Sequence, residues 1–228
     1  MTTVAYCAVS KDGRTDKNQI TWREEALPGL RALTDVVHAE GALASAQIGH
    51  GGPVAEARSN GAPALSPSRR LNTTAFNLSK TATTEELERV VADHRRAGEL
   101  AVAAGFDAVE VHLGHNYLAS AFLSPRLNRR RDEYGGSLEN RARLARRLVE
   151  AVREGSKGSL AVLAKLNLED GVRRGLGLKE SVQVARWLEE DGNVDALVLT
   201  AGSSLLNPMY LFRGDAPRDD FAALMPPL

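Results

Sequence analysis

The chain of 228 residues has little cysteine, no excess of either charge and no long apolar run. Its one cysteine, Cys7, cannot form an internal disulfide. The 29 lysines and arginines equal the 29 aspartates and glutamates, which removes the electrostatic case for a nucleic-acid or anionic membrane partner. No run approaches the roughly 20 apolar residues that cross a bilayer, and the first residues lack a secretory signal pattern. We therefore expect a cytoplasmic protein without nucleic-acid or membrane partners.

Two nucleotide-binding motifs are also missing. No Gly-x-Gly-x-x-Gly follows a predicted strand, and no Gly-x4-Gly-Lys-Ser/Thr occurs, so the sequence supports neither a dinucleotide-binding fingerprint nor a phosphate-loop NTPase. What is present is 43% hydrophobic residues, enough for a packed core. We treat residues 1–228 as one domain, the simpler choice at this length.

Short apolar runs alternate with helical patterns along the chain. The helical spacing of apolar residues, with a capping box at Thr83–Glu86, predicts helices near residues 27–40, 83–104, 138–152 and 178–190. The apolar runs predict strands near residues 3–9, 42–48, 107–112, 160–166 and 195–200. Continuous apolar strands joined by helices indicate an α/β fold with a parallel sheet. A partial TIM (β/α)8 barrel of about five strands fits best, since a complete barrel has eight.

Two further segments carry expectations of their own. The Pro/Ser/Asn-rich stretch from about residue 49 to 82 is expected to be a long loop, either functional or disordered, and its place after a strand favours the functional alternative. The arginines of the helix near 138–152 are expected to face solvent rather than to form a binding patch.

Polar residues stand where the predicted strands end. In a parallel barrel these carboxyl ends meet on one face, which is where functional groups gather. We therefore expect one shared pocket lined by Gln47, His50, His112, His115, Tyr117, Lys165, Asn167 and Thr200.

The densest cluster is His112-x-x-His115-x-Tyr117. Residues three apart in a strand face opposite sides, so the two imidazoles can meet only if the chain bends after His112, which Gly114 permits. Two imidazoles offer N–H donors to one oxygen, which suits a carbonyl that becomes an enolate. The Tyr117 hydroxyl could deliver a proton from another direction.

Two alternatives concern the same residues. His50, His112 and His115 could bind a metal, but no carboxylate is suitably placed in the turn, so no metal site is predicted. Lys165 alternates with apolar neighbours in a buried strand and needs a polar or anionic partner. That partner is either the edge of an anionic cofactor or a neighbouring carboxylate such as Glu110.

The residues around this cluster resemble those of a known family. The run Val109–Leu118, continued by residues 122–125, Asn128, Arg130 and residues 132–141, closely resembles the signature of Old Yellow Enzyme-type FMN oxidoreductases, including 2,4-dienoyl-CoA reductase-like members. Gln47–Gly52 resembles the family's Gln-Leu-x-His-Ala-Gly segment more weakly. Asn116 departs from the pattern, because many relatives have glycine there.

The resemblance implies a function for each site residue. Gln47, Lys165 and His112 would bind FMN, with Gln47 at the pyrimidine edge and Lys165 holding the charge of the reduced flavin. His112 and His115 would bind the carbonyl oxygen of the substrate, and Tyr117 would protonate its α carbon. NAD(P)H would serve as reductant, and the substrate would be a small enone or enoyl compound whose C=C bond is reduced.

The order of elements in the family makes the five strands equivalent to strands 2–6 of eight. The resemblance places a strand under the flavin before them and the FMN phosphate loops after them. We therefore expect this polypeptide alone to bind FMN weakly or not at all. A non-catalytic barrel remnant is the alternative to an ene-reductase-type enzyme, and the sequence leaves the oligomeric state, a homo-oligomer included, open.

Overall fold

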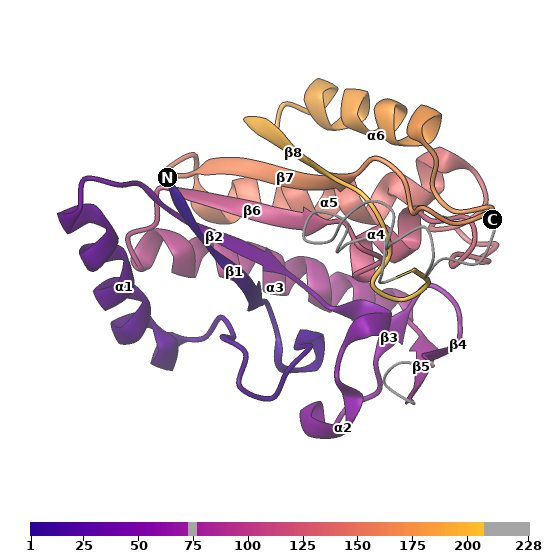
Figure 1. Ribbon diagram of the computed structural model, residues 1–228, viewed down its shortest axis with the longest axis horizontal. Coiled ribbons are helices and arrows are strands. Elements are labelled where there is room, and N and C mark those ends of the chain that lie inside the picture. The colour runs from indigo at the N-terminus through magenta and orange to yellow at the C-terminus, as the bar shows by residue number, and fades with distance from the viewer. Residues whose placement is uncertain (73–76, 208–228) are drawn as a thin grey trace, which may run out of the picture.

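The computed structural model describes residues 1–72 and 77–207, and a five-stranded parallel sheet lies at their centre (Figure 1). The strand order is β1-β2-β6-β7-β8, the order in which the strands occur in the chain. Each predicted strand is present, and its bounds lie within two residues of the prediction: β1 (Thr2–Ala8), β2 (Ala44–Gly49), β6 (Ala108–Leu113), β7 (Ala161–Asn167) and β8 (Ala196–Thr200). The predicted α/β class is confirmed.

A long helix fills each crossover between neighbouring strands. These helices are α1 (Leu27–Ala39), α3 (Thr84–Ala103), α5 (Leu138–Ser156) and α6 (Leu178–Glu190). Thr83 caps α3 through the predicted capping box: its hydroxyl accepts from the Glu86 N–H, and the Glu86 carboxylate accepts from the Thr83 N–H. The helices lie where the apolar periodicity placed them, because their apolar faces are buried against the sheet.

The helices α3 and α5 lie side by side on one face of the sheet (Figure 1). Two glycines allow the short distance between these two helices. A Cβ at Gly98 would lie 2.9 Å from the Val152 carbonyl oxygen, and one at Gly155 would overlap the Arg95 carbonyl oxygen. Only residues without a side chain allow the two helices to pack this closely.

The central strands present two different faces. The face toward the helices carries fully buried apolar side chains: Ala46, Ile48, Val109, Val111, Leu113, Val162, Ala164 and Leu166. Because side chains alternate along a strand, the opposite face carries the intervening residues, and these are largely polar. They include Tyr6, Gln47, Glu110, His112, Lys165 and Asn167. The polar face is therefore the inner face of the barrel segment.

The segment between β2 and α3 has secondary structure that the sequence reading did not predict. It contains α2 (Ala57–Asn60) and a small sheet of order β3-β5-β4, formed by β3 (Leu65–Ser66), β4 (Arg70–Asn72) and β5 (Asn77–Thr81). A second unpredicted element, α4 (Leu118–Leu123), follows the histidine cluster directly. Both lie near the carboxyl ends of the central strands (Figure 1).

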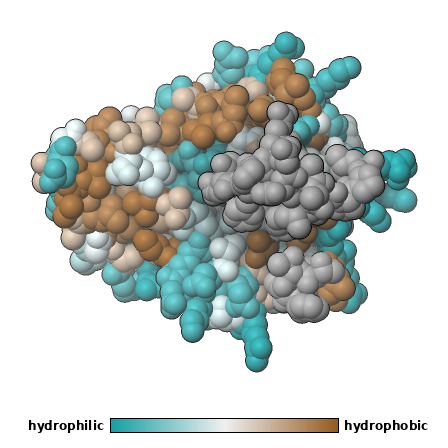
Figure 2. All heavy atoms as spheres, viewed as in Figure 1, coloured by the Kyte–Doolittle hydropathy of each residue, from teal (hydrophilic) through white to brown (hydrophobic). Residues whose placement is uncertain are grey.

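Within the described residues, β1 and β8 each pair with a strand on one side only. The β8 edge exposes apolar surface: Leu199 is 59% exposed, and Val182 and Leu178 of the adjacent α6 are exposed as well. Figure 2 shows apolar side chains gathered along the upper and left parts of this view, and β8 and α6 lie in the upper part (Figure 1). None of the described helices is long and apolar enough to cross a membrane.

The arginines of α5 do not all face solvent as expected. Arg141 is 5% exposed, donates to the Leu123 carbonyl oxygen and forms an ion pair with Glu180 at 2.6 Å. Arg146 and Arg147 are half-buried and form ion pairs with Asp191 and Glu88. The prediction of a solvated basic face was therefore wrong for Arg141, which ties α5 to α4 and α6.

Candidate active site

Five of the predicted site residues gather on the inner face of the sheet. His112 and Lys165 are register partners on β6 and β7, and Gln47 on β2 is the register partner of Glu110. His115 and Tyr117 follow β6 directly. The structure thus places all five side chains at or beside the carboxyl ends of three neighbouring strands.

The chain bends sharply after β6, as the spacing of the two histidines required. Gly114 sits in a crowded place, since a Cβ there would lie 2.9 Å from Thr200 Cγ2 and 3.1 Å from His112 Cε1. His115 and Asn116 then adopt left-handed backbone conformations, with φ of 58° and 57°. Such conformations are uncommon for residues other than glycine, and they turn the chain back toward the sheet.

The bend brings three rings together. The ring centroids of His112 and His115 are 5.0 Å apart, and those of His112 and Tyr117 are 4.5 Å apart. Tyr117 immediately precedes α4, whose first residue, Leu118, donates its N–H to the His50 carbonyl oxygen at 3.0 Å. Two imidazoles and a phenol therefore share one small space.

Burial keeps the three rings uncharged. Burial, followed by the nearby charges of His115 and Lys165, holds the pKa of His112 well below its ordinary value. Burial and the Lys165 charge lower the pKa of His115 to about 4. Burial raises the pKa of Tyr117 above 10, although a hydrogen bond with Thr15 opposes the shift. At neutral pH the cluster therefore offers neutral N–H and O–H groups.

Gln47 and Lys165 meet at one carboxylate. Gln47 Nε2 donates to Glu110 Oε1 at 2.5 Å, and Lys165 Nζ donates to the same oxygen at 3.1 Å. Of the two partners that the sequence left open for Lys165, the structure shows Glu110. The Glu110 side chain is 7% exposed, so the ion pair is screened little by solvent. The Gln47 amide and the Lys165 ammonium group therefore lie within hydrogen-bonding distance of the same Glu110 oxygen.

A second phenol borders the cluster. Tyr6 of β1 packs edge-on against Tyr117, with centroids 5.1 Å apart, and its ring centroid is 6.3 Å from that of His112. Its hydroxyl donates to the Gly13 carbonyl oxygen at 2.5 Å, away from the histidines. Gly49 avoids a close contact with the His112 side chain, since a Cβ at residue 49 would lie 3.2 Å from His112 Cβ.

A buried carboxylate stabilises the bend after β6 through hydrogen bonds. Asp170 is fully buried and accepts hydrogen bonds from Asn116 Nδ2 at 3.0 Å, Ser124 Oγ at 2.5 Å and Asn167 Nδ2 at 3.2 Å. Asn167 Oδ1 in turn accepts the N–H of His115 at 3.1 Å. Asn116, the departure from the family pattern, thus has a partner that holds its left-handed conformation.

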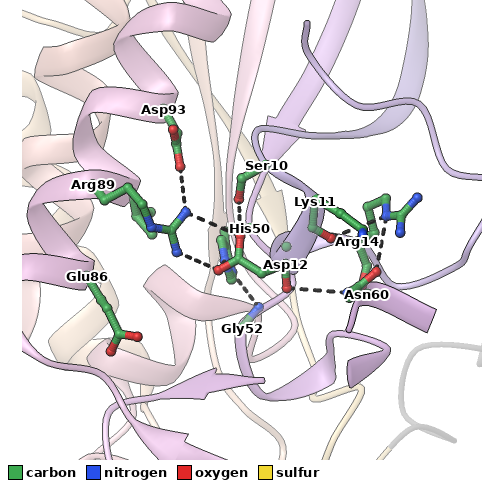
Figure 3. Close-up of polar contacts among 12 residues, drawn as sticks. Ser10, Lys11, Asp12, Arg14, His50, Gly52, Asn60, Glu86, Arg89 and Asp93 are labelled. Carbon is green, nitrogen blue, oxygen red and sulfur yellow. Dashed lines mark hydrogen bonds and ion pairs between the residues drawn. The ribbon is translucent and has the colours of Figure 1, made fainter. Parts of the chain in front are cut away.

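His50 is not part of the ring cluster. Its Nδ1 accepts the Gly52 N–H at 3.0 Å, and its Nε2 lies 3.5 Å from Asp12 Oδ2 (Figure 3). Arg89 of α3 bridges Asp12 and Asp93, as Figure 3 shows. Burial raises the pKa of Asp12, but contacts with His50, Ser10 and Arg89 outweigh burial and hold it well below its ordinary value.

The His50 side chain thus joins the loop after β2 to Asp12 in the loop after β1. Among residues 1–72 and 77–207, no group of three or more His, Cys, Asp and Glu side chains could hold a metal ion. The metal-dependent alternative, which needed His50 beside His112 and His115, is not supported by the described part of the chain.

The sequence profile of the NADH:flavin oxidoreductase / NADH oxidase family matches residues 1–203. The chain belongs to this family. A 4,4'-dithiodibutanoate disulfide reductase from Rhodococcus erythropolis is 57% identical over 228 residues, which are 100% of this chain and 57% of the relative. An NADPH dehydrogenase from Bacillus licheniformis is 34% identical and aligns with 92% of this chain and 61% of its own length.

The fold of this flavin oxidoreductase family member is similar to that of a solved structure, a 2-naphthoyl-CoA reductase complex. The TM-score is 0.84 at 27% identity, and the match covers 88% of this chain and 33% of that chain. The similarity of the fold to solved structures of the Old Yellow Enzyme type confirms the predicted partial TIM barrel. The chain spans 57–61% of the length of the two curated relatives named above.

Two residues of the site escaped the sequence analysis. Asp170 lies in an irregular loop three residues after Asn167, and nothing in the sequence marks its burial. Tyr6 lies inside a predicted strand whose apolar run did not show which side chains face inward, and the register of β1 shifts between Val4 and Cys7. The expected clustering of polar groups at strand ends was the one signal that could have directed attention to Asp170.

Proposed function

We propose that the protein is an FMN-dependent oxidoreductase that uses NAD(P)H to reduce the C=C bond of α,β-unsaturated carbonyl compounds. The observation that carries this proposal is the neutral ring cluster beside an amide and a cation. His112 and His115 supply N–H groups, Tyr117 supplies an O–H group, and Gln47 and Lys165 flank them. Membership in the flavin oxidoreductase family supports a flavin and a nicotinamide reductant.

The donor set of the site fits a flavin edge. Gln47 and Lys165 converge on one Glu110 oxygen, so the two side chains can hydrogen-bond a polar group that takes the place of that oxygen. The flavin's pyrimidine ring carries such groups, and Lys165 supplies a positive charge beside them. When bound, FMN would supply the chemistry of hydride exchange between NAD(P)H and the substrate.

Side chains of the protein would act on the carbonyl oxygen and on the α carbon of the substrate. N–H donors from His112 and His115 would hold the carbonyl oxygen and stabilise the negative charge that develops on it. Neutral imidazoles suit this role, because they donate hydrogen bonds without giving up a full proton to the oxygen. The Tyr117 hydroxyl, protonated at neutral pH, would deliver a proton to the α carbon.

Reduction of a disulfide is the second candidate function. The 57% identical relative from Rhodococcus erythropolis is named for this activity. Two electrons from NAD(P)H cleave the S–S bond to two thiolates, which take up two protons to become thiols. The same N–H and O–H donors would stabilise the thiolates. A thiolate, with an ordinary pKa near 8.5, needs a proton donor less than a carbanion does.

The rate of NAD(P)H oxidation by the protein with FMN added in excess separates these functions, because the polypeptide alone is expected to hold FMN weakly. We expect 2-cyclohexen-1-one to stimulate oxidation strongly under anaerobic conditions, with the saturated ketone as product. Stimulation by 4,4'-dithiodibutanoate alone would favour the second candidate. Turnover of neither compound, in a preparation that retains FMN, would contradict both and support the non-catalytic alternative.

A further inference from the structure

Three hydrogen-bond contacts in a row join the backbone of Gly114 to the side chain of Thr200. The Gly114 N–H donates to His112 Nδ1 at 3.2 Å. His112 Nε2 lies 3.3 Å from His115 Nδ1, and His115 Nε2 lies 2.8 Å from Thr200 Oγ1. The row crosses from the end of β6 to the end of β8.

The first contact fixes the direction of the others. A backbone N–H can only donate, so His112 Nδ1 accepts and the proton of this neutral ring stands on Nε2. His112 therefore donates to His115 Nδ1, which leaves the His115 proton on Nε2. That N–H donates to the Thr200 hydroxyl oxygen. Burial supports the neutral state of both rings, since it lowers their pKa values.

Thr200 is well placed to be a fixed acceptor. It is the last residue of β8, and its carbonyl oxygen accepts the Leu168 N–H at 2.7 Å. Its methyl carbon would lie 2.9 Å from a Cβ at Gly114, so the side chain packs directly against the bend. His115 is held from the other side by Asn167, which accepts its backbone N–H at 3.1 Å.

We propose that Thr200 is a positioning residue for the histidine pair, whose hydroxyl accepts the His115 Nε2–H and holds the His115 ring against His112. This inference rests on the proposed function for its catalytic consequence. With both protons on Nε2, a substrate oxygen can take over the N–H of His112 from His115 Nδ1 and the N–H of His115 from Thr200. Without the hydroxyl, His112 still fixes the His115 proton on Nε2, but that N–H loses its acceptor and the His115 ring can turn out of the row.

Thr200→Val tests the proposal, with Thr200→Ser as the conservative variant. Nitrogen-15 NMR of the imidazoles reports which nitrogen carries the proton and how fast that proton exchanges with solvent. We expect slowly exchanging Nε2–H groups on both rings in the wild type and in Thr200→Ser, and faster exchange of the His115 Nε2–H in Thr200→Val. In the flavin-loaded protein, kcat for the enone should fall about tenfold in Thr200→Val, recover in Thr200→Ser, and leave flavin reduction by NAD(P)H unchanged.

Thr34→Val is the matched control. Thr34 is a buried threonine of α1 whose hydroxyl donates to the Ala104 carbonyl oxygen at 2.7 Å, outside the site. This variant should lower stability without speeding the exchange of the His115 Nε2–H.

The NMR measurement needs no substrate, so the two proposals fail separately. A His115 Nε2–H that exchanges as slowly in Thr200→Val as in the wild type overturns the positioning role even if enones are reduced. Faster exchange in Thr200→Val, in a protein whose wild type reduces no enone, supports the positioning role of Thr200 and refutes the proposed function.

Discussion

Replacing His112 with alanine is expected to lower enone reduction by about 10²–10³-fold, the usual cost of removing one donor to a developing oxyanion. His112 is 5% exposed and lies between the His115 and Tyr117 rings, so no other described side chain can take its place at the end of β6. Reduction of the flavin by NAD(P)H should persist, because that half-reaction involves no substrate carbonyl. Stopped-flow measurement of the two half-reactions separates these effects.

His94→Gln is the control for the loss of a buried histidine. His94 of α3 is 1% exposed, and its Nδ1 lies 2.7 Å from the Val90 carbonyl oxygen, so it packs in the helical layer. This variant should lose stability but keep its enone turnover per folded molecule. Equal enone turnover in His112→Ala and the wild type would remove His112 from the mechanism.

Replacing Tyr117 with phenylalanine is expected to lower enone turnover by about 10²-fold or more, the common contribution of a positioned general acid. Disulfide reduction should fall less, because thiolates need less help from an acid. Burial raises the pKa of Tyr117, so the phenol stays protonated from pH 6 to 9, and the step that depends on it should show a flat pH profile across this range.

Tyr6→Phe is the matched control for this substitution. The two phenols are neighbours, but the Tyr6 hydroxyl donates to the Gly13 carbonyl oxygen and not into the ring cluster. Its loss should leave the protonation step intact. If Tyr117→Phe reduces enones as fast as Tyr6→Phe does, Tyr117 is not the proton donor.

The sequence predicted the central sheet and its long helices well, because these elements carry their own signals. The strands are apolar runs bounded by turn residues, and helices such as α3 have both a cap and a periodic apolar face. The short α4 carries no such signal: all six of its residues are buried, so no amphipathic pattern exists to reveal it. The small sheet formed by β3, β4 and β5 depends on contacts between distant segments, which local patterns do not encode.

The residues of the candidate site could be predicted from the sequence, but the hydrogen bonds and ion pairs that join them could not. The spacing of His112 and His115 required a bend, and Gly114 marked its place. The partner of Lys165 could not be chosen from the sequence, because a cofactor edge and Glu110 satisfy the same need for a negative charge. The burial of Asp170 depends on the packing of α4 against the loop after β7, which only the folded chain shows.

The most direct test of the central claim is a crystal structure of the FMN-loaded protein with a bound enone. The account predicts that the carbonyl oxygen lies within about 3.2 Å of nitrogens of His112 and His115, with the flavin edge at Gln47 and Lys165. An enone bound away from the histidine pair, or a flavin that leaves both Gln47 and Lys165 on Glu110, would contradict it.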